Sequence, residues 1–124
     1  MPVTFIHGEY YASNILVPET AGKIRVCPVD WEMAALGPGL MDHAALTAGK
    51  WRDEERDLIA LAYYQAVPEN EKRAAQDEFL TDLDFCRLHL SLQWLGWSPD
   101  WKPPPEHSQD WLTEAIRLAD NLGL

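Results

Sequence analysis

The spacing of hydrophobic and polar positions changes near residue 40. Before that point, apolar residues occur in short runs or alternate with polar ones, which is typical of β-strands. We predict three short strands, at residues 2–6, 14–17 and 23–29, with a turn at 18–22. From Leu40 onward, apolar residues recur at intervals of three or four, so the remainder of the chain is predicted to be helical.

Four helices are predicted in this second part, and most have a recognisable start or end. Gly49 ends the first, Val67-Pro68 ends the second, and Ser108 and Gly123 suit the two ends of the last. The expected ranges are 40–48, 53–66, 71–95 and 108–122. Beyond Leu80 the third helix is apolar on nearly all sides, so we expect it to be central and surrounded by protein.

Apolar stripes on the two long helices predict where they pack. The third helix is expected to bury Ala75, Phe79, Leu83, Cys86, Leu90 and Trp94. The last helix is expected to bury either Trp111 or Leu112, together with Ala115, Ala119 and Leu122. A stiff, proline-rich loop at 96–105 separates them. The aromatic cluster around this loop is expected to pack the two helices together, and a ligand pocket is the alternative reading for its members Trp94, Trp97, Trp101 and Trp111.

Composition limits the class of protein. The chain has 124 residues, 47% of them hydrophobic, which is enough for a single globular domain over residues 1–124. It carries 10 basic and 20 acidic side chains, a formal charge of −10, and no basic cluster, which argues against nucleic-acid binding. No apolar run is long enough to span a membrane and no signal peptide is visible, so we expect a cytoplasmic protein. The spacing of Cys27 and Cys86 predicts two reduced and buried thiols.

Oxygen-bearing side chains occur where the predicted strands begin or end. Glu9 lies in the loop after the first strand, Asn14 begins the second, and Asp30 follows the third. We expect these three groups to converge at one edge. Phosphoryl transfer through Mg²⁺ needs a carboxylate that takes the proton of the acceptor hydroxyl, and amide and carboxylate oxygens that hold the metal. The pattern therefore favours a metal-dependent phosphotransferase.

The order of these segments resembles the aminoglycoside phosphotransferase family, which shares the protein-kinase-like fold with choline kinases and homoserine kinases. The resemblance covers residues 4–48 and rests on His7-Gly8-Glu9, Asn14-Ile15-Leu16, Val29-Asp30-Trp31-Glu32, Gly37-Pro38-Gly39 and Asp42-His43-Ala44. It implies an α+β fold, the mostly helical C-terminal lobe of a protein-kinase-like fold, in which a small β element carries the catalytic and metal-binding loops. The segment at 37–39 is expected to form a turn.

The resemblance also implies a role for each matching residue. Glu9 takes the position of the catalytic base. Asn14 and Asp30 take the positions of metal ligands, with Asp30 as the principal one. His7 is expected to support the loop and Asp42 to steady it from the following helix. In the same loop, the tyrosines at positions 10 and 11 are expected to pack, and contact with an acceptor is the alternative reading.

Two further carboxylate features bear on the chemistry. Glu32 lies two residues beyond Asp30, and in an extended chain it faces the same side, so it is a candidate for a second metal or its water shell. Glu9 stands where the family has Asp. The additional methylene moves the carboxylate by roughly 1 Å, a displacement that can cost about 100-fold in rate. Glu at this position fits a different acceptor or a degenerate site.

Groups that would hold the nucleotide are not found. In the family, an N-terminal lobe supplies a nucleotide loop and a Lys–Glu pair, whereas the four lysines here lie in turns or helix-like segments. We therefore expect a C-terminal lobe that is inactive or nearly so alone, and that uses Mg²⁺ and ATP or GTP when the missing lobe is joined in cis or in trans. The uncovered face predicts self-association.

Three functions follow from these observations. The first is the catalytic lobe of an ATP-dependent phosphotransferase for a small-molecule hydroxyl. The acceptor is open among aminoglycoside, sugar, choline-like amine and amino-acid hydroxyl, and the acidic chain mildly favours a cationic one. The second is a non-catalytic binding module derived from that lobe. The third, a metal-dependent hydrolase using His7, Glu9, Asp30, Asp42 and His43, is disfavoured because adjacent helical residues point to different sides.

Overall fold

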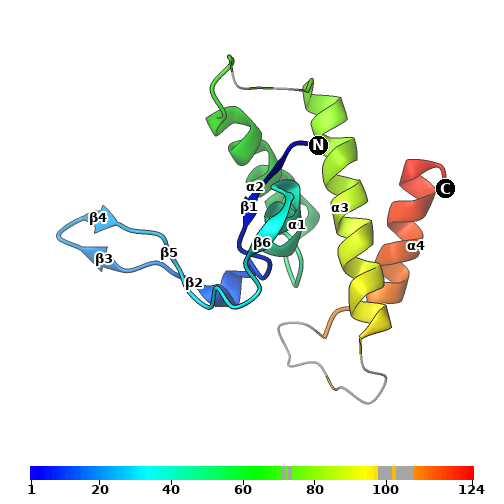
Figure 1. Ribbon diagram of the computed structural model, residues 1–124, viewed down its shortest axis with the longest axis horizontal. Helices are drawn as coiled ribbons and strands as arrows, with labels where there is room; N and C mark the ends of the chain where they lie inside the picture. Colours follow the sequence, from blue (N-terminus) through cyan, green and yellow to red (C-terminus); the bar gives the residue numbers. More distant parts are fainter. Residues whose placement is uncertain (71, 73, 98–101, 103–107) are drawn as a thin grey trace.

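The computed structural model describes residues 1–70, 72, 74–97, 102 and 108–124, and within them the fold is α+β (Figure 1). Short strands occupy the first 38 residues and helices the remainder. The strands are β1 (Val3–Ile6), β2 (Ile15–Leu16), β3 (Glu19–Thr20), β4 (Lys23–Ile24), β5 (Cys27–Pro28) and β6 (Ala35–Pro38). The α+β class predicted from the sequence is confirmed.

The described strands pair as three antiparallel two-stranded ribbons. β1 pairs with β6, β2 with β5, and β3 with β4. The β2–β5 and β3–β4 ribbons form one arm that projects away from the helices, whereas the β1–β6 ribbon lies beside them (Figure 1). The strand predicted at 23–29 is thus divided into β4 and β5, and the tight turn falls at Ala21 and Gly22, which both have positive φ.

The prediction of a turn at 37–39 is wrong. Gly37 and Pro38 belong to β6, where they lie opposite Thr4 and Val3 of β1. Gly and Pro hide a strand from pattern analysis, but a Pro is tolerated on an edge strand. Gly37 also has a packing reason, because a Cβ there would lie 2.9 Å from the side chain of Ile6.

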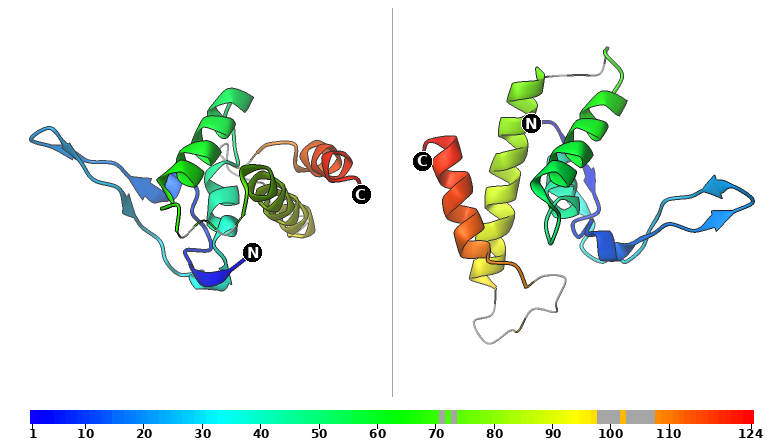
Figure 2. Two further views of the ribbon diagram at one scale, coloured as in Figure 1. Left: turned by 90° about the horizontal axis from the view of Figure 1, so that it is seen from above. Right: turned by 180° about the vertical axis from the view of Figure 1, so that it is seen from behind.

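The helices of the described chain are α1 (Leu40–Leu46), α2 (Asp53–Ala66), α3 (Gln76–Gly96) and α4 (Trp111–Leu122). The predicted range of α2 is confirmed. The N-cap of α4 lies two residues later than expected, at Asp110 and not Ser108, and its side chain accepts a hydrogen bond from the backbone N–H of Thr113 at 3.0 Å. α3 and α4 lie side by side and antiparallel (Figure 2).

The core lies where the catalytic-loop candidate and the helices meet. Its members come from the loop after β1 and from all four helices, and they are Tyr11, Ala44, Ala45, Ala60, Phe79, Leu83, Cys86, Leu90 and Trp111. The stripe predicted on α3 is confirmed at four positions, whereas Ala75 is exposed and Trp94 is half-buried. On α4 the buried residues are Trp111, Ala115 and Leu118, so Leu118 takes the core position expected for Ala119.

The prediction that α3 is surrounded by protein is wrong. Phe85, Leu92 and Leu95 are 41%, 56% and 46% exposed, because α1 and α4 cover only part of its circumference. Of the aromatic cluster, Trp94 and Trp111 stack at 5.6 Å between ring centroids and join α3 to α4, as expected. Trp97 is exposed, and Trp101 lies outside the described residues.

Two smaller observations complete the fold. Both cysteines are free thiols, and the predicted burial is confirmed for Cys86 but wrong for Cys27, which is half-buried on the short strand β5. In the part of the chain that the structure describes, no helix combines the length and apolarity needed to cross a bilayer.

Candidate functional site

Three carboxylates meet where the loop after β1 approaches the segment after β5. Glu9, Asp30 and Glu32 each place one oxygen within 4.8 Å of the others. Glu9 is half-buried, whereas Asp30 and Glu32 are exposed. Three negative groups at this distance repel one another, and a divalent cation that prefers oxygen ligands would offset the repulsion. The expected convergence of Glu9 and Asp30 is therefore present in the structure.

Asp30 and Glu32 come together through a bend and not through strand geometry. Asp30 has a φ of +66°, in the left-handed region that short polar side chains such as Asp tolerate. A turn follows, closed by the hydrogen bond from the N–H of Ala34 to the carbonyl of Trp31 at 3.1 Å. Glu32 therefore lies on the same side as Asp30, as expected. The extended backbone from which this was predicted is wrong, because the chain bends there.

Asn14 joins the two segments that carry the carboxylates. Its side-chain Nδ2 donates to the carbonyl of Glu9 at 3.0 Å, and its own carbonyl accepts from the N–H of Val29 at 2.9 Å. The other side-chain atom, Oδ1, accepts no hydrogen bond from a described residue. The amide oxygen of Asn14 is thus available as a ligand for a cation.

His7 is a fixed internal support of the loop. Its side chain is buried at 2% exposure, Nε2 donates to the carbonyl of Val29 at 2.9 Å, and Nδ1 accepts from the N–H of Glu9 at 3.3 Å. Both contacts are satisfied by the tautomer with its proton on Nε2. The ring also lies 4.5 Å from that of Trp31. His7 therefore joins the Glu9 loop to the segment that leads into Asp30.

Asp42 in the first turn of α1 binds the backbone just before Glu9 through hydrogen bonds. Its two carboxylate oxygens accept hydrogen bonds from the N–H groups of His7, at 2.7 Å, and Gly8, at 2.9 Å. Gly8 has a φ of +87°, and a Cβ at this position would lie 2.3 Å from the carbonyl oxygen of Met33. Only glycine fits here, because the backbone conformation and the close approach to Met33 both exclude a side chain.

Tyr11 anchors the other end of the loop to the helical layer. It is buried, and its Oη accepts a hydrogen bond from Nε1 of Trp94 on α3 at 3.0 Å. Burial raises the pKa of Tyr11 to about 12. The expectation that this tyrosine packs is confirmed. Its partner Trp94 was not foreseen, because the two lie 83 residues apart and no local pattern connects them.

The ligand set imagined for a hydrolase does not form. Within the described residues, the His, Cys, Asp and Glu side chains close enough to share an ion are Glu9, Asp30 and Glu32. Asp42 turns to the loop, as described above. His43 is buried against the ring of Tyr63 at 4.8 Å. Asp42 and His43 are thus engaged in separate contacts away from the carboxylates, and the hydrolase prediction loses its geometric basis.

The sequence of this chain matches a known protein family. A family model described as the phosphotransferase enzyme family matches residues 1–77, well over half of the chain. The match contains the Glu9 loop, the Asp30 segment, α1 and α2. No match was found among curated proteins or among solved structures. On the strength of this match, the chain belongs to the phosphotransferase enzyme family.

Proposed function

We propose that this chain is the C-terminal catalytic lobe of an ATP-dependent phosphotransferase that acts on a small-molecule hydroxyl. The observation that carries the proposal is the group of Glu9, Asp30 and Glu32 within 4.8 Å of one another, inside the segment that matches the family. Carboxylate and amide oxygens are the donor set that Mg²⁺ prefers, and Asn14, which is bonded to the Glu9 backbone, supplies the amide.

Each side chain then has a chemical task. Glu9 orients the acceptor hydroxyl and takes its proton. Asp30 and Asn14 hold the metal, and Glu32 reaches the metal or its water shell. Mg²⁺, when bound with ATP or GTP, neutralises negative charge on the transferred phosphoryl group. The Glu9 N–H donates to Nδ1 of His7, and the His7 N–H donates to Asp42, so that the loop is fixed and Glu9 is positioned before substrate arrives.

The remaining parts of the proposed enzyme lie outside the carboxylate group. A nucleotide-binding lobe, in cis or in trans, is needed to hold the triphosphate. The β1–β6 ribbon offers an apolar face for it, since Val3, Phe5 and Leu36 share one side of the ribbon and are 70%, 63% and 77% exposed. The same face also supports self-association of this chain. The acidic site and the charge of −10 favour a cationic acceptor.

The position of Glu9 favours a second candidate function, a non-catalytic metal-binding module. Its carboxylate lies as near to Asp30 and Glu32 as a third metal ligand would. In that case Glu9 coordinates the cation and accepts no proton, and the lobe serves as a binding platform.

Metal titration of the purified chain distinguishes the two functions. Mn²⁺, a spectroscopic substitute for Mg²⁺, is titrated by electron paramagnetic resonance with and without ATP. The Asp30→Asn variant is expected to weaken binding by about tenfold or more. The Glu9→Gln variant is expected to leave the affinity within about threefold if Glu9 is the base, and to weaken it as Asp30→Asn does if Glu9 is a ligand.

Controls and contradicting outcomes are available for this titration. Glu19→Gln removes an exposed carboxylate of β3 and should leave the affinity unchanged. Binding that is indifferent to Asp30→Asn would exclude the proposed metal site. Strong ATP-dependent phosphorylation by the purified chain would contradict the proposal that a second lobe is required.

A further inference from the structure

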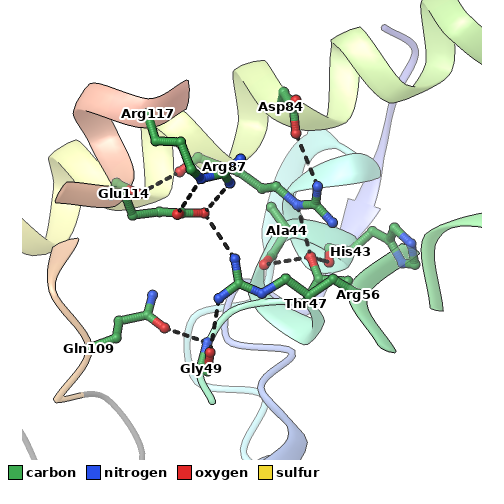
Figure 3. Close-up of polar contacts among 11 residues, drawn as sticks. His43, Ala44, Thr47, Gly49, Arg56, Asp84, Arg87, Gln109, Glu114 and Arg117 are labelled. Carbon is green, nitrogen blue, oxygen red and sulfur yellow. Dashed lines mark hydrogen bonds and ion pairs between the residues drawn. The ribbon is translucent and has the colours of Figure 1, made fainter. Parts of the chain in front are cut away.

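A small, partly open cavity lies between the helices, away from the residues of the candidate site. It has a volume of about 10 Å³, and its lining includes Thr47 of α1's end, Arg56 of α2, Arg87 of α3 and Glu114 of α4 (Figure 3). A cavity of this size accommodates one water-sized particle and no polyatomic ion.

Arg56 contributes an unpartnered donor to this region. Its Nη1 pairs with Oε1 of Glu114 at 3.1 Å, and its Nη2 donates to the carbonyl of Gly49 at 3.1 Å (Figure 3). Its Nε is buried, and no described residue accepts from it.

Arg87 contributes a second unpartnered donor to the same region. Its Nε donates to Oγ1 of Thr47 at 3.2 Å, and its Nη1 pairs with Oδ1 of Asp84 at 3.0 Å. Its Nη2 is buried and likewise without an acceptor among the described residues. Both unpartnered nitrogens thus belong to side chains that line the same cavity.

Buried donors on charged groups are costly to leave unsatisfied, and in folded proteins such donors normally have a partner, either a protein group or an ordered water molecule. We propose that this cavity binds one small hydrogen-bond acceptor, a water molecule or a chloride ion, that bridges Arg56 Nε and Arg87 Nη2. The charges around the cavity are compatible with either acceptor. Arg56 and Arg87 against Glu114 give the lining an excess of one positive charge, which suits chloride, whereas the Glu114 carboxylate itself repels an anion and suits water.

The bridge would connect helices that support the loops of the candidate site. It joins α2 to α3, and through Arg87 and Thr47 it reaches the end of α1. The first turn of α1 holds Asp42, which grips the loop before Glu9. The acceptor therefore belongs to the support of that loop.

A double-mutant cycle tests the bridge in the full chain. Arg56→Met and Arg87→Met each retain an apolar stem, and the unfolding equilibrium constant is measured in urea. The two arginines share no described partner, so a bridge predicts that the double variant loses less stability than the two single losses combined, by about threefold or more in the constant. The pair Arg52→Met and Arg87→Met is the control, because Arg52 is exposed, and it should be additive. Additive behaviour of the Arg56–Arg87 pair, or a coupling of opposite sign from like-charge repulsion, would overturn the proposal.

Crystals of the unaltered chain grown in sodium bromide give a second measurement that does not depend on the variants. An anomalous bromide peak between the two guanidinium groups supports an anion, and an ordered peak without anomalous signal supports water. High-resolution maps with no density between Arg56 Nε and Arg87 Nη2 would refute the bridge.

Discussion

Asp42 on α1 holds the backbone of His7, 35 residues earlier in the chain, through a hydrogen bond of 2.7 Å from the His7 N–H to Oδ2. The second oxygen accepts from the N–H of Gly8. A carboxylate that accepts two backbone hydrogen bonds is a strong, directional clamp. Through it, α1 fixes the direction in which the chain enters the Glu9 loop.

Replacement of Asp42 by Asn should therefore destabilise the fold. An amide offers one acceptor oxygen, so one of the two backbone N–H groups loses its partner, at a cost of about 1–3 kcal/mol in the free energy of unfolding. Urea denaturation measures this change. Asp53→Asn, which removes a carboxylate from the first turn of α2, is the matched control and should cost far less. Equal losses in the two variants would show that helix-end charge, and not the clamp, is the source.

The Gly8→Ala substitution should be more harmful than Gly22→Ala. Both glycines have positive φ, so each alanine bears a backbone cost of about 1–2 kcal/mol. At Gly8 the new Cβ also meets the carbonyl of Met33 at 2.3 Å, whereas at Gly22 no atom lies within 4 Å. The difference between the two unfolding free energies isolates the effect of the close contact. A Gly8→Ala loss no greater than that of Gly22→Ala would contradict the described approach of the two segments.

His43 should make the fold sensitive to acid. Burial, with a further contribution from the charge of Arg87, lowers its pKa to about 4 from an ordinary value near 6.5. The neutral ring is thus favoured in the folded state, and its full contribution is present above pH 6.5. As the pH falls from 6.5 to 4, the unfolded state binds the proton first, and about 3 kcal/mol of stability is lost.

Urea denaturation at pH 7 and pH 4.5 measures the contribution of His43. His43→Leu should reduce the difference between the two pH values, because the titrating group is removed while the apolar contact with Tyr63 is kept. His89→Leu on the exposed side of α3 is the control and should leave the difference unchanged. An unaltered pH dependence in His43→Leu would argue against a neutral, buried ring.

Shortening the candidate base tests how the loop is built. Glu9→Asp removes one methylene and withdraws the carboxylate by roughly 1 Å. If Glu9 is the base, we expect the intact two-lobed enzyme to retain or increase its turnover and the Mn²⁺ affinity of this chain to stay within about threefold. Complete loss of turnover would show that the loop is organised around the longer side chain.

Trp94→Phe should loosen the attachment of the loop to α3. The variant loses the hydrogen bond from Nε1 to Tyr11 and part of the stacking on Trp111, together about 1–2 kcal/mol of the free energy of unfolding. Trp97→Phe at an exposed position is the control, with little expected change. Equal effects of the two substitutions in thermal or urea denaturation would be inconsistent with a special role for Trp94.

The sequence by itself determined the α+β class, the full range of α2, and the family to which the chain belongs. These features depend on local periodicity and on the order of a few motifs, which residues such as Glu9, Asn14 and Asp30 carry without reference to distant contacts. It also predicted the core stripe of α3, since four apolar residues at helical spacing require a buried face.

Tertiary structure alone decided the rest. Gly37 and Pro38 form a strand only because β1 is present to pair with them, and α3 keeps an exposed apolar side because α1 and α4 cover only part of it. The clamp of Asp42 on His7, the bond of Trp94 to Tyr11 and the cavity between Arg56 and Arg87 join residues that are far apart in the chain. Such contacts follow from how the elements pack, and no local pattern contains that information.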